Sequence, residues 1–259
     1  MMRRSLVILA VLATACSGVA DQPPVPTTSG PPPTSTTPIP TTVTTEARPV
    51  WDGYQATNRE PATLAAVARQ PLEVFESPGQ AEPKLTLEPE TILGTVRVLG
   101  VLGEPVDGWL EVMLPVRPNG STGWVRANNV SLYAVDGEIH VDLSDRELRY
   151  TVDGVELFVS EVGIGSDYAE TPTGTFFVTD RVTMNNPGSP WGPNALGLSA
   201  HSNTITEFNG GDGIIGIHGT DNPGSIGRNI SLGCIRLPNE MITVLYPMVP
   251  LGTRVTVSA

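Results

Sequence analysis

The chain has 259 residues, which is too long for one ordinary domain and short for three. Its formal charge is −12 at neutral pH. Nucleic acid and anionic membrane surfaces attract clustered lysine and arginine, so this acidic balance argues against both as electrostatic partners.

The first fifteen residues have the pattern of a secretory signal peptide. Arg3 and Arg4 give a positive start, an apolar run covers residues 6–12, and small residues precede Cys16. The run is too short to span a membrane as a mature helix. Small residues followed by cysteine resemble a bacterial lipobox, although Ala13 stands where that motif usually has leucine. The resemblance implies cleavage before Cys16 and lipid attachment to its sulfur, and ordinary secretion is the alternative.

Residues 16–48 are predicted to form the lipid anchor and an extended tether. Proline, threonine and serine dominate residues 21–45, and almost no large apolar residue interrupts them. Such a segment cannot bury enough surface to offset its ordering entropy, and its proline density favours extended conformations. An anchored tether would hold the folded part at the outer face of the cytoplasmic membrane.

Residues 49–134 are predicted to form a small β domain. Asp107-Gly108 and Pro118-Asn119-Gly120 separate alternating apolar runs, which is the strongest short-range signal for hairpins. The preceding residues 51–66 are compatible with a helical turn or with the lead into a strand.

The order of these runs, with Trp109 opening one and Trp124 lying in a Gly-Trp-Val motif, resembles bacterial SH3-like domains. The resemblance implies an auxiliary or spacer module. We expect both tryptophans to pack in a barrel core rather than to form a ligand platform.

Residues 135–259 are predicted to form a second β-rich domain. Alternating runs over residues 138–165 predict a hairpin series with a turn at Asp153-Gly154, and further strands are expected to follow. Residues 238–246 are the best helix candidate, because Pro238 opens a stretch with apolar residues at helical spacing. The fold class is therefore mainly β: a small SH3-like barrel, then a β-rich catalytic domain with one short helix.

Cys234 is the only thiol of the exported chain if Cys16 is lipidated. A single cysteine in an oxidising compartment has no disulfide partner, so it is a candidate reactive thiol. A buried, inert cysteine is the alternative. A nucleophilic thiol needs a base, and His218 ends an apolar run sixteen positions earlier. A helix opening at Pro238 would be expected to lower the pKa of the thiol.

Several segments carry a family resemblance. His218-Gly219-Thr220 is followed by Ser-Leu-Gly-Cys-Ile-Arg-Leu at residues 231–237, and the upstream segments 170–182 and 195–199 add Thr-Pro-Thr-Gly-Thr-Phe and Ala-Leu-Gly-Leu-Ser. Their order and spacing resemble the L,D-transpeptidase catalytic domain. The resemblance covers residues 139–259.

The resemblance implies a role for each matching residue. Cys234 would be the nucleophile and His218 its base, with the Gly219 carbonyl orienting the imidazole. The N–H groups of Gly233 and Cys234 would form an oxyanion hole. Support of the cysteine loop or substrate binding would fall to Ser231, Arg236, Asn239 and Trp191.

One position departs from the family pattern. The family usually has histidine before the Gly-Cys pair, where this chain has Leu232, and His201 is a candidate replacement. Even so, His201 and His140 are expected to be structural or surface residues. Arg236 could instead form an ion pair with Glu240, and the tryptophan at position 191 could simply be packing.

The resemblance implies an enzyme that cross-links peptidoglycan stem peptides through a cysteine acyl-enzyme. D-Ala would leave, a three-to-three link would form, and carbapenems would acylate the thiol. The alternatives are an L,D-carboxypeptidase, with water as acceptor, and a wall-binding lipoprotein without activity. No cofactor or metal is expected, because three histidines and one thiol lack ligand spacing. A monomer that binds no nucleic acid is expected.

Overall fold

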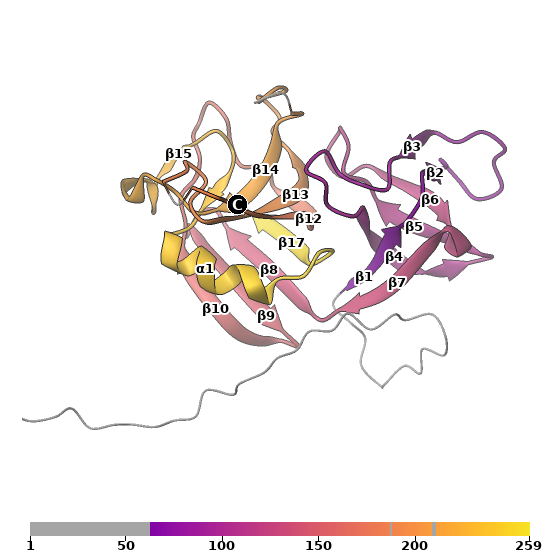
Figure 1. Cartoon of the computed structure of the whole chain (residues 1–259), viewed down its shortest axis with the longest axis horizontal. Coiled ribbons are helices and arrows are strands. Elements are labelled where there is room, and N and C mark those ends of the chain that lie inside the picture. Colours follow the sequence, from indigo (N-terminus) through magenta and orange to yellow (C-terminus); the bar gives the residue numbers. More distant parts are fainter. Residues whose placement is uncertain (1–62, 187, 209–210) are drawn as a thin grey trace, which may run out of the picture. The chain divides into compact units, whose positions relative to one another are not determined.

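The computed structural model describes residues 63–259 except 187, 209 and 210 (Figure 1). The predicted signal peptide, the tether and Cys16 lie outside the described residues. Residues 45–259 belong to one unit. Within the described ranges, no helix is long and apolar enough to cross a membrane.

Five strands of the N-terminal half form an antiparallel sheet in the order β6-β5-β4-β1-β7. They are β1 (Thr63–Ala68), β4 (Val98–Val106), β5 (Trp109–Met113), β6 (Thr122–Arg126) and β7 (Val130–Val135). A separate pair is formed by β2 (Leu72–Val74) and β3 (Leu85–Leu87), and the 3-10 turn η1 covers Ala127–Asn129. Of the segment 51–66, whose sequence leaves helix and strand open, residues 51–62 lie outside the described residues. Residues 63–66 belong to β1, whose two edges pair with β4 and β7.

The turns predicted from Asp-Gly and Asn-Gly sequences are present. Asp107 and Gly108 have φ of 48° and 80°, and Asp153 and Gly154 have φ of 59° and 74°. Two consecutive positive φ values are the signature of the tight hairpin turn that matches strand twist. Gly120, with φ of 81°, belongs to the longer turn between β5 and β6. These hairpin predictions are confirmed.

The C-terminal half forms an eight-stranded mixed sheet in the order β10-β9-β8-β17-β12-β13-β14-β16. Its strands are β8 (Gly137–Asp142), β9 (Glu147–Val152), β10 (Val155–Glu161), β12 (Gly174–Thr183), β13 (Asn194–His201), β14 (Ile214–His218), β16 (Ile235–Arg236) and β17 (Arg254–Ser258). Outside it, β11 (Ile164–Gly165) pairs in parallel with β15 (Asn229–Ser231), and the 3-10 turn η2 covers Pro223–Ser225. The fold is mainly β, as predicted.

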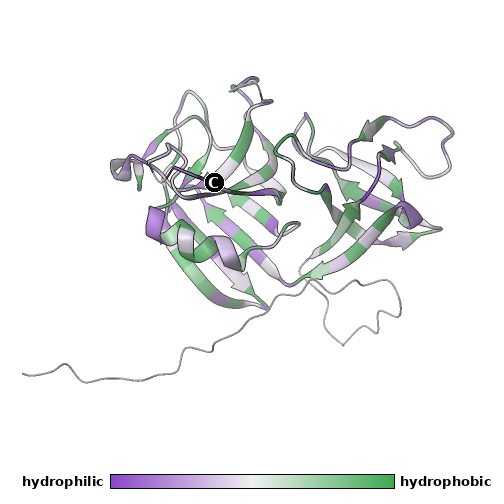
Figure 2. Ribbon diagram, viewed as in Figure 1, coloured by the Kyte–Doolittle hydropathy of each residue, from purple (hydrophilic) through white to green (hydrophobic). Residues whose placement is uncertain are grey.

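The α-helix α1 (Asn239–Met248) follows β16 in the chain. Pro238 is its N-cap residue, and Ile242 and Leu245 are buried in the core of the large sheet. The Tyr150 hydroxyl donates to the Met248 carbonyl at 2.9 Å, which ties the end of the helix to β9. The predicted helix is confirmed, and Figure 2 shows the alternation of apolar and polar residues along the strands that surround this core.

Trp109 lies in the core of the N-terminal sheet, as expected. Its side chain is 7% exposed and packs edge-on against Phe75, with ring centroids 5.2 Å apart. The Arg126 guanidinium covers the same ring at 4.5 Å. Trp124 is half-buried and pairs through its backbone with Phe75. That this half is an SH3-like domain, and that a domain boundary falls at residue 134, stay predictions.

Two parallel strands bring the predicted site together. β14 pairs with β16 so that Ile217 lies opposite Ile235 and His218 opposite Arg236. His218 ends β14, and Cys234 directly precedes β16. Residues sixteen positions apart in the chain therefore lie on adjacent strands of one sheet.

Candidate active site

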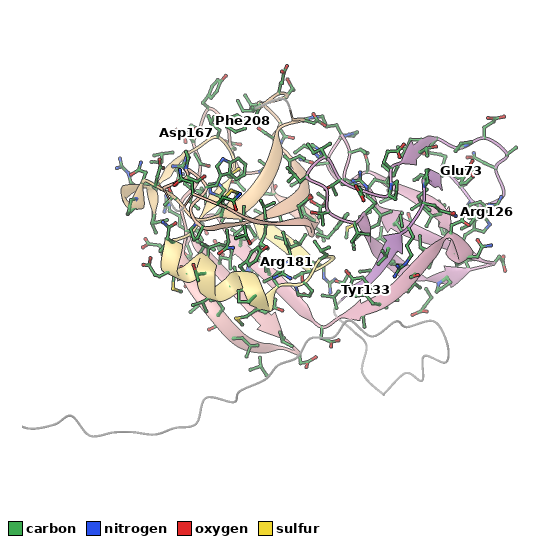
Figure 3. All side chains as sticks on the ribbon, viewed as in Figure 1. Glu73, Arg126, Tyr133, Asp167, Arg181 and Phe208 are labelled. Atoms are coloured by element: carbon green, nitrogen blue, oxygen red, sulfur yellow. The ribbon has the colours of Figure 1, made fainter. Side chains whose placement is uncertain are left out.

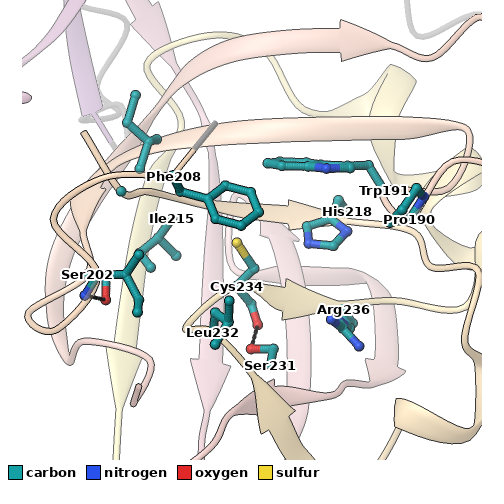
Figure 4. A pocket seen from close by; sticks show the side chains of 13 residues that line it. Pro190, Trp191, Ser202, Phe208, Ile215, His218, Ser231, Leu232, Cys234 and Arg236 are labelled. Atoms are coloured by element: carbon teal, nitrogen blue, oxygen red, sulfur yellow. Dashed lines mark hydrogen bonds between the residues drawn. The ribbon is translucent and has the colours of Figure 1, made fainter. Parts of the chain in front are cut away.

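The imidazole of His218 is held by the backbone of the next residue. Its Nδ1 bonds to the Gly219 carbonyl oxygen at 2.5 Å, and because that oxygen can only accept, Nδ1 carries the proton. The Nε2 atom of the neutral ring is then an acceptor. Figure 4 shows the Cys234 sulfur directed toward the space between the His218 imidazole and the Phe208 ring.

The loop before the cysteine is fixed by two hydroxyl groups. Ser231, 1% exposed, donates to the Cys234 carbonyl at 2.6 Å and accepts from the Gly233 N–H at 3.1 Å. Thr171, in the Thr-Pro-Thr-Gly segment, donates to the Gly233 carbonyl at 2.9 Å and accepts from the Gly165 N–H. Both the N–H and the carbonyl of Gly233 are therefore held by side chains.

The Gly233 N–H is engaged by Ser231 and is not free to donate to a substrate in this structure. This geometry does not support its expected part in an oxyanion hole. Among the residues that the structure describes, the Cys234 N–H has no hydrogen-bond acceptor. The sequence did not indicate Gly216, whose backbone acts to lower the pKa of the Cys234 thiol.

Burial sets the charge states of the pair. It lowers the pKa of His218 to about 4, opposed by the Gly219 hydrogen bond and reinforced by the Arg236 charge. Burial also raises the pKa of the Cys234 thiol, although the Gly216 backbone and the Arg236 charge oppose this. Both shifts disfavour a thiolate–imidazolium pair, so the resting site holds a neutral thiol beside a neutral imidazole.

The expectation that a helix N-terminus lowers the pKa of the thiol is wrong. α1 begins at Asn239, and β16 separates it from Cys234. The dipole effect fades beyond the first turn, whereas burial acts on the sulfur directly.

A cavity of about 110 Å³ surrounds the thiol. Apolar side chains dominate its lining, and the polar groups are few. The lining residues are Pro190, Trp191, Ser202, Ile205, Phe208, Gly213, Ile214, Ile215, His218, Ser231, Leu232, Cys234 and Arg236. A mostly apolar pocket with a few convergent polar groups is the usual form of a small-ligand site.

Trp191 forms a wall of this pocket and contacts the imidazole. Its ring centroid lies 4.9 Å from that of His218 and 6.5 Å from that of Phe208. The next residue, Gly192, has φ of 62°, and a Cβ there would lie 2.6 Å from the Gly219 Cα. The tryptophan turn therefore packs directly on the His-Gly turn.

Arg236 lines the pocket and forms no ion pair with Glu240 in the described part of the chain. Its Nε is buried without a hydrogen-bond partner. Asn239 lies elsewhere: its Oδ1 accepts from the Thr220 N–H at 2.8 Å and is not among the lining atoms. Asn239 therefore holds the turn after His218.

The other histidines lie outside the pocket lining. His201, 4% exposed, ends β13, and its Nε2 lies 3.5 Å from an oxygen of Asp212. His140 is exposed and contacts Ser258. Leu232, 47% exposed, lines the pocket where the family usually has histidine. Among the described residues, no cluster of His, Cys, Asp or Glu could hold a metal ion.

The fold and the site define a mainly β protein in which a thiol and an imidazole share one pocket. The family model of the YkuD-type L,D-transpeptidase catalytic domain matches residues 136–257. YkuD of Bacillus subtilis is 34% identical over 126 residues, which cover 49% of this chain and 68% of that protein. The chain belongs to this L,D-transpeptidase family.

Two further proteins are similar to parts of this chain. YqjB of Bacillus subtilis is 31% identical over 134 residues, 48% of this chain and 72% of that protein. An L,D-transpeptidase from Mycobacterium tuberculosis H37Rv has 17% sequence identity and a TM-score of 0.43, over 63% of this chain and 90% of its own. The two Bacillus subtilis relatives each match about half of this chain.

Proposed function

We propose that this chain is a peptidoglycan L,D-transpeptidase with Cys234 as nucleophile and His218 as general base. The observation that carries the proposal is the hydrogen bond from His218 Nδ1 to the Gly219 carbonyl. That bond fixes the tautomer and leaves Nε2 as an acceptor in the pocket that contains the thiol. Family membership supports the reaction class.

Acylation begins with the neutral pair. The thiol proton passes to His218 Nε2 while the sulfur attacks the carbonyl carbon of the third stem residue of a donor tetrapeptide. The tetrahedral oxyanion receives a hydrogen bond from the Cys234 N–H. Collapse breaks the bond to the terminal D-Ala, whose nitrogen takes the proton from His218. A thioester on Cys234 remains.

Deacylation reverses these roles. The side-chain amine of an acceptor stem attacks the thioester carbon and loses a proton to His218, and the sulfur leaves and is reprotonated. The product is a three-to-three cross-link. Water in place of the amine gives an L,D-carboxypeptidase, and the experiment below distinguishes the two.

Arg236 supplies the charge that orients the donor. Arg236 lines a pocket whose lining residues include no Asp or Glu, in a chain of net charge −12. A guanidinium binds a carboxylate with two parallel hydrogen bonds. We assign to it a carboxylate of the donor stem.

The test is incubation of residues 46–259, wild type and Cys234→Ala, with disaccharide-tetrapeptide stems, followed by mass spectrometry. Dimers that have lost one D-Ala, absent with Cys234→Ala, support transpeptidation. Tripeptide alone would identify a carboxypeptidase. Absence of either product, together with no adduct from a carbapenem, would refute the enzymatic proposal and favour a wall-binding protein.

We also propose that the enzyme is a lipoprotein at the outer face of the cytoplasmic membrane, anchored through Cys16. The small residues before this cysteine and the proline- and threonine-rich segment after it support the assignment. Metabolic labelling with a fatty-acid probe should label the wild type and not Cys16→Ser. Equal labelling of the two proteins would contradict the anchor.

A further inference from the structure

One arginine of the N-terminal half binds both ends of the loop that joins β13 to β14. Arg117, in the turn between β5 and β6, donates through Nε to Asp212 Oδ1 at 2.8 Å and through one Nη to the Ser202 carbonyl at 2.6 Å. Its other Nη donates to the carbonyls of Ile205 and Asp212, at 3.2 Å and 3.1 Å. Four hydrogen bonds thus run from one guanidinium to a loop about ninety positions away in the chain.

Asn119, two residues further along the same turn, fixes the strand that enters the loop. Its Nδ2 donates to the His201 carbonyl at 2.7 Å, and its Oδ1 accepts from the His201 N–H at 2.8 Å. The amide therefore pairs with the last residue of β13 as a neighbouring strand would.

The base of the loop is closed tightly around this contact. The Ser202 N–H donates to the Gly213 carbonyl at 2.9 Å, and the Ile205 N–H donates to Ser202 Oγ at 3.0 Å. Gly213 has φ of 58°, and a Cβ there would lie 1.9 Å from the Ile205 carbonyl oxygen and 3.1 Å from an Nη of Arg117. Glycine is required for this approach.

The same loop ends form one wall of the pocket around the thiol. Ser202, Ile205 and Gly213 line the cavity together with His218 and Cys234. A group that fixes Ser202 and Gly213 therefore fixes the wall that faces the reacting atoms.

We propose that Arg117 is a positioning residue for the reaction, through which the N-terminal sheet sets the substrate-binding wall of the pocket. The inference rests on the proposed function and extends it: the N-terminal half is part of the catalytic unit rather than a spacer. Arg117 acts through the loop and does not touch the thiol or the imidazole.

The test compares Arg117→Met with Arg126→Met. Arg126 lies on the same sheet, stacks on Trp109, and lies well apart from Phe208 in Figure 3. We measure kcat and KM for stem tetrapeptide, the alkylation rate of Cys234 by iodoacetamide, and amide hydrogen exchange over residues 201–218.

The expected result is a rise of KM and a loss of about tenfold in kcat/KM for Arg117→Met only, because small displacements of a binding wall cost that much. Iodoacetamide is small and does not depend on the wall, so its rate should not change. A general loss of structure would expose the half-buried Cys234 further and change that rate as well.

Arg117→Lys should show an intermediate loss, because an ammonium cannot hold four acceptors at once. Asp212→Asn should cause a smaller loss, because three of the four acceptors are carbonyls and remain. These two variants decide the question if Arg117→Met does not fold.

The measurement of amide hydrogen exchange makes the test independent of the proposed function. The Ser202 and Ile205 amides should exchange faster in Arg117→Met than in wild type or Arg126→Met. If wild type does not act on stem peptides, the proposed function fails, and exchange still decides whether Arg117 sets the wall. Unchanged exchange, or equal kcat/KM in the two methionine variants, would overturn the proposal.

Discussion

The imidazole of His218 is 5% exposed, and this burial decides its charge. A catalytic thiol is often pictured as a preformed thiolate, but here burial favours the neutral form of both partners. In the proposed reaction, the proton would therefore move only when the sulfur attacks. Gly216 and Gly219 contribute through backbone atoms, so at these positions no side chain signals a role.

The charge of His218 predicts how stability depends on pH. Its pKa is about 4 in the folded chain, and the pKa of an unperturbed histidine is 6.5, so the unfolded chain binds more protons between these values. The free energy of unfolding should fall as the pH drops from 6.5 to 4, by about 3 kcal/mol. Denaturant titrations at several pH values measure it.

Two results check the origin of this loss. In His218→Gln the pH dependence in that window should flatten. In the wild-type protein the His218 imidazole should titrate near pH 4 by NMR. Titration of His218 between pH 6 and 7 would show that the ring is not desolvated.

Substitution of Ser231 tests how the loop that contains Cys234 contributes to stability and to activity. Ser231→Ala removes two hydrogen bonds and leaves the buried Gly233 N–H without its acceptor, so it should lower the free energy of unfolding by about 1–3 kcal/mol. It should also lower kcat, because the Cys234 backbone loses the hydrogen bond from Ser231 that fixes it. Ser144→Ala, at an exposed turn, is the control and should be near neutral. An unchanged kcat in Ser231→Ala would show that Thr171 alone holds the loop.

At the scale of elements, short strands position the side chains of the candidate active site. β14 and β16 pair over two register positions, yet this pairing puts the thiol beside the imidazole. Residues 232–234 between β15 and β16 must turn sharply, and Gly233 provides the turn with φ of 111°. The spacing of sixteen positions between His218 and Cys234 in the sequence reflects this connection between β14 and β16.

Gly233→Ala should therefore reduce both stability and activity. A Cβ would lie 2.8 Å from Ile215 Cδ1, and alanine rarely adopts that φ, so we expect a loss of about 1–3 kcal/mol and a large fall in kcat. Gly79→Ala, with φ of 83° and no neighbour within 4 Å, tests strain without a clash. Equal losses in both variants would mean that backbone strain alone is responsible.

At the scale of the whole molecule, the two sheets share core residues. Phe177 belongs to β12 of the large sheet, is fully buried, and packs in the core of the small sheet. The Tyr133 hydroxyl of β7 donates to the Leu251 carbonyl at 2.8 Å. With Arg117 and Asn119, these contacts join the N-terminal half to the part that the family model matches.

Phe177→Ala tests this joint core. The cavity should lower the free energy of unfolding by about 3–5 kcal/mol, and because the core is shared, both sheets should unfold in one transition. Hydrogen exchange in denaturant would report each sheet separately. Val159→Ala, at a 41% exposed position, should cost little. Loss of protection in one sheet alone would show that the halves are independent.

The sequence by itself determined the features that depend on local order. Asp-Gly turns require positive φ whatever surrounds them, apolar alternation marks strands, and the helix after Pro238 follows from spacing. The order and spacing of His218, Gly219, Gly233 and Cys234 resemble the L,D-transpeptidase motif, and this resemblance indicated the reaction class.

Only the tertiary structure decided the rest. β1 is a strand because β4 and β7 pair with its two edges. The raised pKa of the thiol comes from burial, and the engagement of the Gly233 N–H comes from how its loop folds. The contact of Arg117 with Asp212 joins residues 95 positions apart. Such effects depend on which groups meet in space, and local sequence patterns do not contain that information.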